Sequence, residues 1–176
     1  MLVGLVGPPG AGKSTVAAQL SAGLGAPIAP MDGYHLSNAV LDDRGLRGVK
    51  GAPDTFDVDA FVSMLRSLRG GSDVWLPDFD RTVDEPRPDQ ILIPADAPIV
   101  IVEGNYLLVW EAVADLLDLV AYIDVDPAVR VQRLIDRHVE FGKSREDAAA
   151  FVNESDERNT VVIESQRHRA DLSIVV

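Results

Sequence analysis

Residues 7–14, GPPGAGKS, decide the fold that this sequence predicts, and Thr15 follows them directly. The stretch fits the phosphate-binding pattern of a glycine, four residues, and then Gly-Lys-Ser. An apolar run of buried-strand type precedes it at 2–6, and a run rich in alanine and leucine follows it at 15–24 and predicts a helix. A strand, a tight loop and a helix N-terminus direct backbone N–H groups and the helix dipole to one point, which favours an anion.

Each residue type in this loop has a chemical reason. Glycines permit backbone angles and a close approach that a side chain would block. Lys13 is expected to reach the β- and γ-phosphates of a nucleoside triphosphate, and the hydroxyl of Ser14 to bind Mg²⁺. The alternative is an ordinary turn rich in glycine and proline, but the flanking strand and helix favour a phosphate site. The residues expected to bind ATP are Gly7, Pro8, Pro9, Gly10, Ala11, Gly12, Lys13, Ser14 and Thr15.

The composition limits the class of protein. The chain has 176 residues, 47% of them apolar and 25% charged, which suits one globular domain. No apolar run reaches the length of a membrane span and the N-terminus lacks a signal-peptide layout, so we expect a cytoplasmic protein without a membrane partner. Cysteine is absent, which excludes disulfides, thiol catalysis and cysteine-ligated metals.

The charge balance limits the partners. The formal net charge is −12, and such a surface repels phosphate backbones, so nucleic acid is not an expected partner. An acidic protein that binds a polyanion has to concentrate positive charge locally, and basic residues gather in 44–47, 66–69, 81–87, 130–145 and 158–169. A homodimer is the default expectation for assembly, because dimers are the commonest soluble oligomers.

Strand-like runs at 2–6, 27–31, 98–103 and 119–125 alternate with helix-like stretches. This alternation predicts an α/β fold, a mostly parallel sheet with helices on both faces. Ligands of such folds collect at the carboxyl ends of the strands. Asp32 and Glu103 each follow an apolar run, and we expect both to meet the glycine-rich loop in one cleft.

Each of these acidic residues has two interpretations. Asp32 is either a turn aspartate ahead of a glycine or a cleft carboxylate that takes a proton from a substrate hydroxyl. Tyr34 and His35 either line the acceptor pocket or simply pack. Glu103 is either an exposed strand-end residue or an acid that faces Mg²⁺ or water.

The remaining chain divides into elements of uneven clarity. Segment 36–56 shows no helical or strand period, which indicates either a functional loop or a solvated one, and it carries the basic cluster Arg44, Arg47 and Lys50. The other expectations are a helix over 57–69, a short strand at 74–76, an exposed loop at 82–90 ending in an edge strand at 90–93, a helix over 105–117 and a last strand at 170–176, with 167–169 bordering the adenine.

A helix that begins at Asp126-Pro127 carries Arg130, Arg133 and Arg137, spaced so that they share one side. Together with the Gly-Lys-Ser turn that follows, this helix predicts a lid over approximately 127–145 that closes arginines over phosphates. The alternative is a solvated helix face that pairs with neighbouring acidic residues.

With these residues assembled, the sequence resembles the phosphoribulokinase, uridine kinase and type I pantothenate kinase family of P-loop kinases. The resemblance covers nearly the whole chain, in the order GPPGAGKST, DGYH, RGLRGVKGAPDTFD, PDFDR, IVIVEGNYLL and the arginine-bearing helix. It is strongest with the compact bacterial branch described as nucleoside, pantothenate or sugar kinase-like. The resemblance implies a three-layer P-loop NTPase fold, with one kinase domain over 1–176.

The resemblance also implies residue roles. Asp32 would be the general base, Lys13, Arg133 and Arg137 would stabilise the transferring phosphoryl group, and Glu103 would contact Mg²⁺ or the acceptor. The resemblance places Lys50, Phe79 and Arg81 around the acceptor, so that with Tyr34 and His35, suggested by their position, the residues expected there are Asp32, Tyr34, His35, Lys50, Phe79, Arg81 and Glu103. This chain has Gly-Tyr-His after Asp32 where uridine kinases have an aromatic pair, and Asp78-Phe79-Asp80 where pantothenate kinases have aromatic-Ser-His, so the acceptor stays open.

The expected reaction is therefore transfer of the γ-phosphoryl group of ATP to a hydroxyl of a small metabolite. One alternative is a nucleotide kinase, whose acceptor phosphate would bind Arg44, Arg47 and Lys50. A second is a nucleotide switch that acts on a protein partner, although the guanine-reading Asn-Lys-x-Asp motif and the Ser-Gly-Gly signature of transporter ATPases are both absent.

Overall fold

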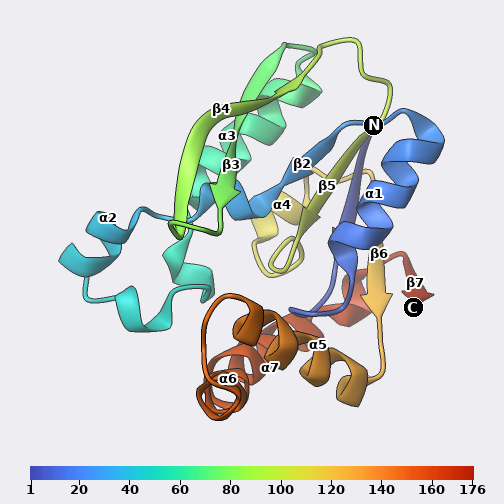
Figure 1. The fold of residues 1–176 in the computed structure, drawn as a ribbon. Helices are drawn as coiled ribbons and strands as arrows, with labels where there is room; N and C mark the ends of the chain where they lie inside the picture. Colours follow the sequence, from blue (N-terminus) through green and yellow to red (C-terminus); the bar gives the residue numbers. More distant parts are fainter.

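The computed structural model describes residues 1–176, and its centre is a parallel sheet of five strands in the order β2-β5-β1-β6-β7 (Figure 1). The strands are β1 (Leu2–Val6), β2 (Ile28–Pro30), β5 (Val100–Gly104), β6 (Leu119–Asp124) and β7 (Leu172–Val175). This arrangement confirms the predicted α/β fold. The fold is topologically suited to a site because β1, β2 and β5 end side by side at one edge.

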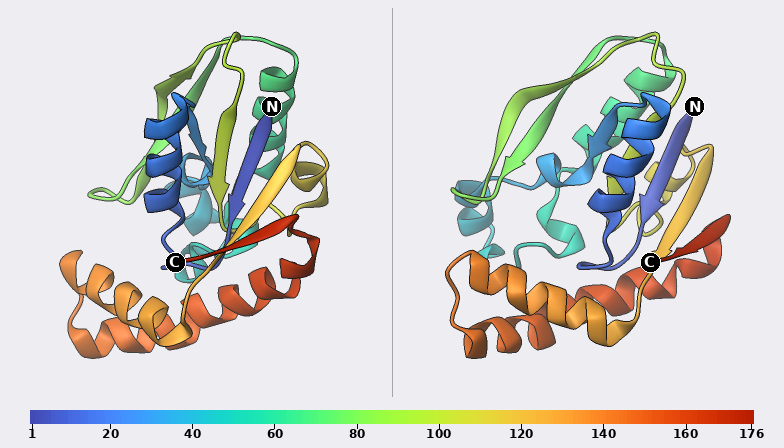
Figure 2. Two further views of the ribbon diagram at one scale, coloured as in Figure 1. Left: turned by 90° about the vertical axis from the view of Figure 1, so that its right-hand side faces the viewer. Right: turned by 45° about the vertical axis from the view of Figure 1, so that its right-hand side comes forward.

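Helices cover both faces of the sheet and give three layers (Figures 1 and 2). Alternate residues of β1 face opposite ways, so that Leu5 joins the core under α1 (Lys13–Leu24), whereas Leu2 and Val6 join the larger core under α3 (Val58–Arg69). Phe61 and Leu65 of α3 are fully buried there. The apolar spacing of 57–69 thus produces the predicted helix, capped by the Asp57 side chain.

The prediction of a loop at 82–90 is wrong, although most of the segment is exposed as predicted and the predicted strand at 90–93 is present. That segment lies mostly in β4 (Glu85–Ile93), which pairs antiparallel with β3 (Val74–Asp80), and β3 extends well beyond the predicted 74–76. The two prolines of β4 are tolerated because the ribbon has only two strands, so each strand leaves one side without hydrogen-bonding neighbours. Leu76 and Ile93 anchor the hairpin in the main core.

Segment 36–56 is more ordered than its sequence suggests. It contains α2 (Asn38–Asp43) and two 3₁₀ turns, η2 (Arg47–Val49) and η3 (Pro53–Thr55), each too short to show a period. Hydrogen bonds from Leu36 N to Thr55 O (2.9 Å) and from Asp57 N to Tyr34 O (2.8 Å) close its base. The predicted helix over 105–117 shrinks in turn to α4 (Glu111–Ala114), because tight turns occupy the residues before it.

The last helices lie together below the carboxyl edge of the sheet (Figures 1 and 2). They are α5 (Pro127–Glu140), α6 (Arg145–Phe151), a π-helical turn (Val152–Asp156), α7 (Glu157–Ser165) and η5 (Arg167–Arg169). Asp126 caps α5 at the predicted start of this helix, and Ser144 caps α6. No helix of the chain is long and apolar enough to cross a membrane.

Candidate active site

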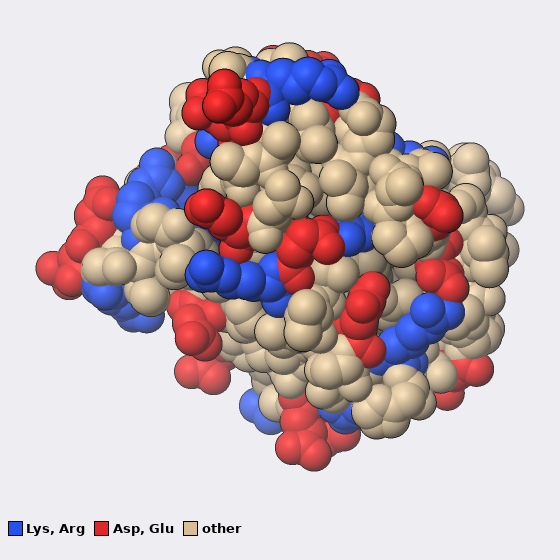
Figure 3. All heavy atoms as spheres, turned by 90° about the horizontal axis from the view of Figure 1, so that it is seen from below, with Lys and Arg blue, Asp and Glu red and all other residues tan.

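A cleft of about 700 Å³ opens at the carboxyl edge of the sheet, between the glycine-rich loop, the tip of the hairpin and α5. Figure 3 looks onto this edge of the molecule, where basic and acidic side chains alternate and leave no broad positive patch. The cleft is therefore suited to a small ligand whose groups contact individual acidic and basic side chains.

The glycine-rich loop touches α5 directly. Gly10 has a φ of +78°, and a Cβ there would lie 2.8 Å from Leu134 Cγ and 2.9 Å from the carbonyl oxygen of Arg130. A side chain at this position would push the loop and the helix apart. Gly10 therefore allows the glycine-rich loop to pack directly against α5.

Lys13 lies buried at the base of the cleft, with 6% of its surface exposed. Its ammonium group donates one hydrogen bond, 3.1 Å long, to the carbonyl oxygen of Pro8. Burial lowers the pKa of Lys13, although Glu103 and Asp32 act in the opposite direction. A buried ammonium group with unused donors fits an anion such as a phosphate.

The register of the sheet places Glu103 at the edge where the glycine-rich loop begins. Glu103 of β5 pairs with Leu5 of β1 on one side and with Pro30 of β2 on the other. The hydroxyl of Ser14 donates to Glu103 Oε2 at 3.2 Å. Burial raises the pKa of Glu103, while Lys13 opposes the shift.

Asp32 follows β2 in the 3₁₀ turn η1 (Met31–Tyr34). Arg81 Nη2, from the hairpin tip, donates to Asp32 Oδ2 at 2.6 Å. Burial pushes the pKa of Asp32 upward, but the Arg81 guanidinium, with smaller effects from His35 and Lys13, outweighs it and holds the pKa below its usual value. A Cβ on Gly33 would lie 2.2 Å from the carbonyl oxygen of Pro77, so only glycine lets this turn rest on β3.

An aromatic wall stands beside Asp32. The ring of His35 lies 4.0 Å from that of Phe56 and 4.7 Å from that of Phe79, centroid to centroid. Burial lowers the pKa of His35, which favours a neutral imidazole. Tyr34, unlike His35, does not line the cleft. Its ring is buried against that of Phe61, with 5.0 Å between the two centroids. Its apolar ring serves the core.

The arginines of α5 do not act alike. Arg133 and Arg137 line the cleft, and a Cβ on Gly12 would lie 3.6 Å from Arg133 Nη1. Arg130, one turn earlier, is buried and paired with Glu157 of α7 at 2.6 Å. Arg130 therefore joins two helices, and only the other two arginines face a ligand.

The remaining expected site residues are also placed. Lys50, Phe79 and Arg81 line the cleft, whereas Arg44 does not. In the glycine-rich loop, Pro9, Gly10, Gly12, Ser14 and Thr15 line the cleft with Lys13, and Gly7, Pro8 and Ala11 lie behind them as buried support. Arg167 and Arg169, expected near the adenine, bond to Asp124 and to the Leu108 carbonyl oxygen and do not line the cleft.

The family model for the phosphoribulokinase / uridine kinase family matches residues 2–176. The chain belongs to the phosphoribulokinase / uridine kinase family. It is therefore a kinase, a phosphotransferase whose acceptor group is a hydroxyl.

Among three similar proteins, two are named as kinases. The chain is 36% identical to YggC of Escherichia coli (strain K12), over 98% of this chain and 76% of that protein. It is 30% identical to a uridine kinase of Halobacterium salinarum, over 78% of this chain and 62% of that enzyme. A protein from Silicibacter sp. TM1040, provisionally described as a fructose transport system kinase, has 36% identity and a TM-score of 0.92 over 99% of this chain and 89% of its own.

The residues of this family member fit a magnesium ion. Ser14 and Glu103 offer two oxygen ligands, and no cluster of three acidic or histidine side chains is present elsewhere. Mg²⁺ commonly takes one or two protein ligands and completes its octahedron with phosphate oxygens and water. The buried ammonium of Lys13 fits the phosphates themselves.

Sequence reasoning missed several cleft residues. Asp84 lies in the segment taken for an exposed loop, and only its neighbour Arg81 carried a motif signal. His138 and Asp156 also line the cleft and bond to each other at 3.0 Å. They stand on α5 and on the π-helical turn, 18 residues apart, so no local spacing indicates the pair.

Proposed function

We propose that this kinase transfers the γ-phosphoryl group of ATP to a hydroxyl of a nucleoside, a sugar or a pantothenate-like metabolite, with Asp32 as the general base. The proposal rests on one observation: Lys13 and the two carboxylates of Asp32 and Glu103 face the same cleft. Burial lowers the pKa of Lys13, and the charges of both carboxylates oppose that shift.

The residues divide into a phosphate side and an acceptor side. Lys13, Arg133 and Arg137 would offset the charge of the triphosphate, and Ser14 and Glu103 would hold Mg²⁺. When bound, Mg²⁺ neutralises the charge that develops on the transferring group. His35 and Phe79 would form the wall against which the acceptor lies.

Asp32 would remove the proton of the acceptor hydroxyl while that oxygen forms a bond to the γ-phosphorus and the bond to ADP breaks. Arg81 occupies Oδ2 of this carboxylate, and the other oxygen is available for the proton. Because the pKa of Asp32 lies below its usual value, the carboxylate is ionised at neutral pH and ready to accept.

The variant Asp32→Asn tests this role. We expect it to lower kcat by roughly 10²- to 10⁴-fold while the Kd for ATP stays nearly unchanged, because the amide cannot accept the proton but leaves the phosphate side intact. ADP release is measured with a panel of nucleosides, sugars and pantothenate in the presence of Mg²⁺-ATP.

The matched control is Asp78→Asn on β3, whose carboxylate bonds only to the N–H of Phe79 and does not line the cleft. It should retain full activity. Unchanged turnover in Asp32→Asn would remove this residue from the chemistry, and ADP release that never depends on an added acceptor would contradict acceptor phosphorylation itself.

A further inference from the structure

The cations of the cleft fall into two groups. Four of them form no ion pair with the protein, namely Lys13, Arg133, Arg137 and Lys143. The other three, Arg47, Lys50 and Arg81, each contact a carboxylate at about 3 Å or less. Positive charge is therefore free on the side of the glycine-rich loop and α5, and is neutralised on the side of the hairpin.

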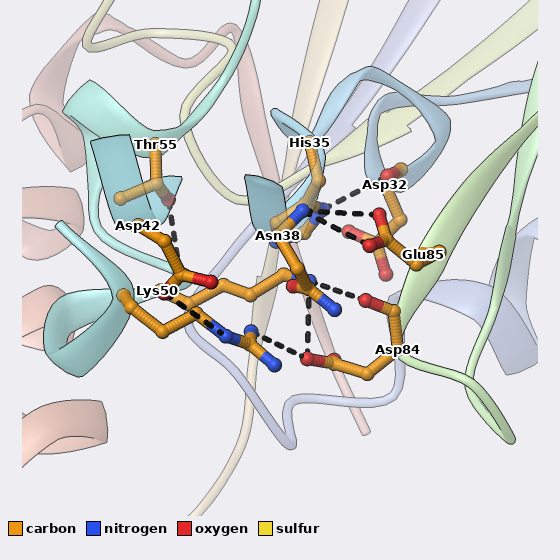
Figure 4. Close-up of polar contacts among 10 residues, drawn as sticks. Asp32, His35, Asn38, Asp42, Lys50, Thr55, Asp84 and Glu85 are labelled. Atoms are coloured by element: carbon orange, nitrogen blue, oxygen red, sulfur yellow. Dashed lines mark hydrogen bonds and ion pairs between the residues drawn. The ribbon is translucent and has the colours of Figure 1, made fainter. Parts of the chain in front are cut away.

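Lys50 is the most completely satisfied of these cations. Its ammonium group donates to Asn38 Oδ1 at 2.6 Å, to the carbonyl oxygen of Asp84 at 2.5 Å and to Asp84 Oδ2 at 3.0 Å (Figure 4). An ammonium group has three donors, so none is left for a ligand. Only 10% of the side chain is exposed.

The Asp84 carboxylate forms ion pairs with two basic residues of segment 36–56, Lys50 and Arg47. Its Oδ2 also lies 3.0 Å from Arg47 Nη1. The backbone of Asp84 has a φ of +56°, a conformation that few non-glycine residues adopt. The Arg47 and Lys50 side chains lower the pKa of Asp84 against the effect of its burial, so the carboxylate stays charged.

The loop itself is anchored from the other side. The carbonyl oxygen of Gly51 accepts hydrogen bonds from Tyr106 Oη at 2.5 Å and from Asn159 Nδ2 at 3.3 Å. In addition, the Glu85 carboxylate accepts from the N–H of Asn38, 3.1 Å from each oxygen (Figure 4). These contacts fix Lys50 and Asp84 against each other, so an incoming anion would have to compete with a preorganised carboxylate.

We propose that Asp84 is a specificity-determining residue that makes the acceptor side of the cleft select an uncharged polyhydroxyl compound, a nucleoside or an unphosphorylated sugar, over its phosphorylated counterpart. This inference rests on the proposed function and names its acceptor class. A phosphate group placed at Lys50 would face the carboxylate of Asp84 and find no free donor, and the two like charges would repel each other.

The test compares acceptor pairs that differ by one phosphate, uridine with uridine monophosphate and ribose with ribose 5-phosphate. In the wild type we expect the phosphorylated member of a pair to have a kcat/KM at least about 100-fold lower. In Asp84→Asn this ratio should fall by about tenfold or more, because Lys50 and Arg47 keep their hydrogen bonds but lose their counter-charge.

A binding measurement makes the test independent of which acceptor is used. Inorganic phosphate is titrated calorimetrically into protein saturated with a non-hydrolysable ATP analogue. Asp84→Asn should bind phosphate about tenfold more tightly than the wild type. Asparagine suits this substitution because it nearly preserves the shape and tolerates positive φ, and a thermal melt verifies folding.

The matched control is Asp89→Asn, a second aspartate of the hairpin with a positive φ (+54°) that does not line the cleft. It should change neither the ratio nor the phosphate affinity. A wild type that prefers the phosphorylated member of a pair, or an Asp84→Asn protein with unchanged phosphate affinity, overturns the proposal. Both results leave hydroxyl phosphorylation standing, whereas failure of the proposed function would appear as ADP release without any acceptor.

Discussion

At the scale of single residues, Arg81 is the group that most directly controls Asp32. Its guanidinium contacts Asp32 Oδ2 at 2.6 Å, and its charge is the main influence that holds the pKa of that carboxyl down against burial. The proton-accepting form of Asp32 is the ionised one. Activity should therefore persist to lower pH than an ordinary buried carboxylate would allow, and fall as the pH drops through the depressed pKa.

The variant Arg81→Gln should move the acidic limb of the pH profile of kcat/KM toward higher pH. Without the guanidinium the burial of Asp32 is no longer offset, so its pKa rises and the carboxylate is protonated sooner as the pH falls. The measurement is kcat/KM between about pH 3 and 9 at saturating ATP, a range that includes the depressed pKa of Asp32.

Arg87→Gln is the matched control, because Arg87 also pairs with a hairpin aspartate, Asp80, but lies outside the cleft. Its profile should coincide with that of the wild type. A limb that stays in place in Arg81→Gln would mean that another group sets the acidic limb.

At the scale of elements, α5 carries two cleft arginines and one structural arginine within ten residues. Replacing Arg133 or Arg137 by alanine should lower kcat by roughly 10²- to 10³-fold, because each guanidinium would stabilise charge on the transferring phosphoryl group. Their folding should be little affected, since neither forms an ion pair with the protein. Steady-state kinetics and thermal melts measure the two effects separately.

Two further arginines give the contrast. Arg145→Ala removes an exposed arginine of α6 that pairs with Asp136, and it should behave as the wild type in both measurements. Arg130→Ala breaks the buried link to Glu157 and should lower the melting temperature. Normal kcat in both Arg133→Ala and Arg137→Ala would assign α5 a purely structural role.

At the scale of the whole molecule, the cleft is built from both ends of the chain, and a ligand that spans it should stabilise the fold. ATP at about 100 times its Kd should add about 2.7 kcal/mol to the free energy of unfolding, which raises the melting temperature by roughly 5 to 10 °C. In Lys13→Ala this rise should largely disappear, because the buried ammonium no longer meets the phosphates. Differential scanning fluorimetry measures the shift.

Arg66→Ala, on α3 and away from the cleft, controls for the loss of a positive charge and should keep the full shift. An undiminished shift in Lys13→Ala would place the triphosphate elsewhere.

The parts that sequence predicted well are those in which a local pattern has one physical solution. The run 2–6 with GPPGAGKS behind it could only be a strand, a loop and a helix, and the helix over 57–69 follows from its apolar spacing and its cap. The predicted strands at 74–76 and 90–93 do pair, but the rest of the hairpin could not be predicted, because Pro86 and Pro88 argue against a strand unless the strand has a free side, which is a property of the sheet.

The same division runs through the site. Asp32 and Glu103 could be predicted because each lies at the carboxyl end of an apolar run, and Lys13 because it belongs to the glycine-rich loop that follows such a run; parallel strands end at a common edge. The interpretation of Tyr34 as a pocket residue could not be decided from sequence, because proximity to Asp32 does not determine which way a ring points. In the structure the ring packs in the hydrophobic core.

The sequence alone therefore determined the phosphate loop, the parallel sheet and the acidic residues at its edge, since these depend on short-range order and strand polarity. The tertiary structure alone decided which cations are free to meet a ligand. Lys50 looks like a binding residue in the chain, and only the turn of the hairpin, 34 residues away, brings Asp84 onto it. Charge compensation acts through space, so it cannot be inferred from residue order.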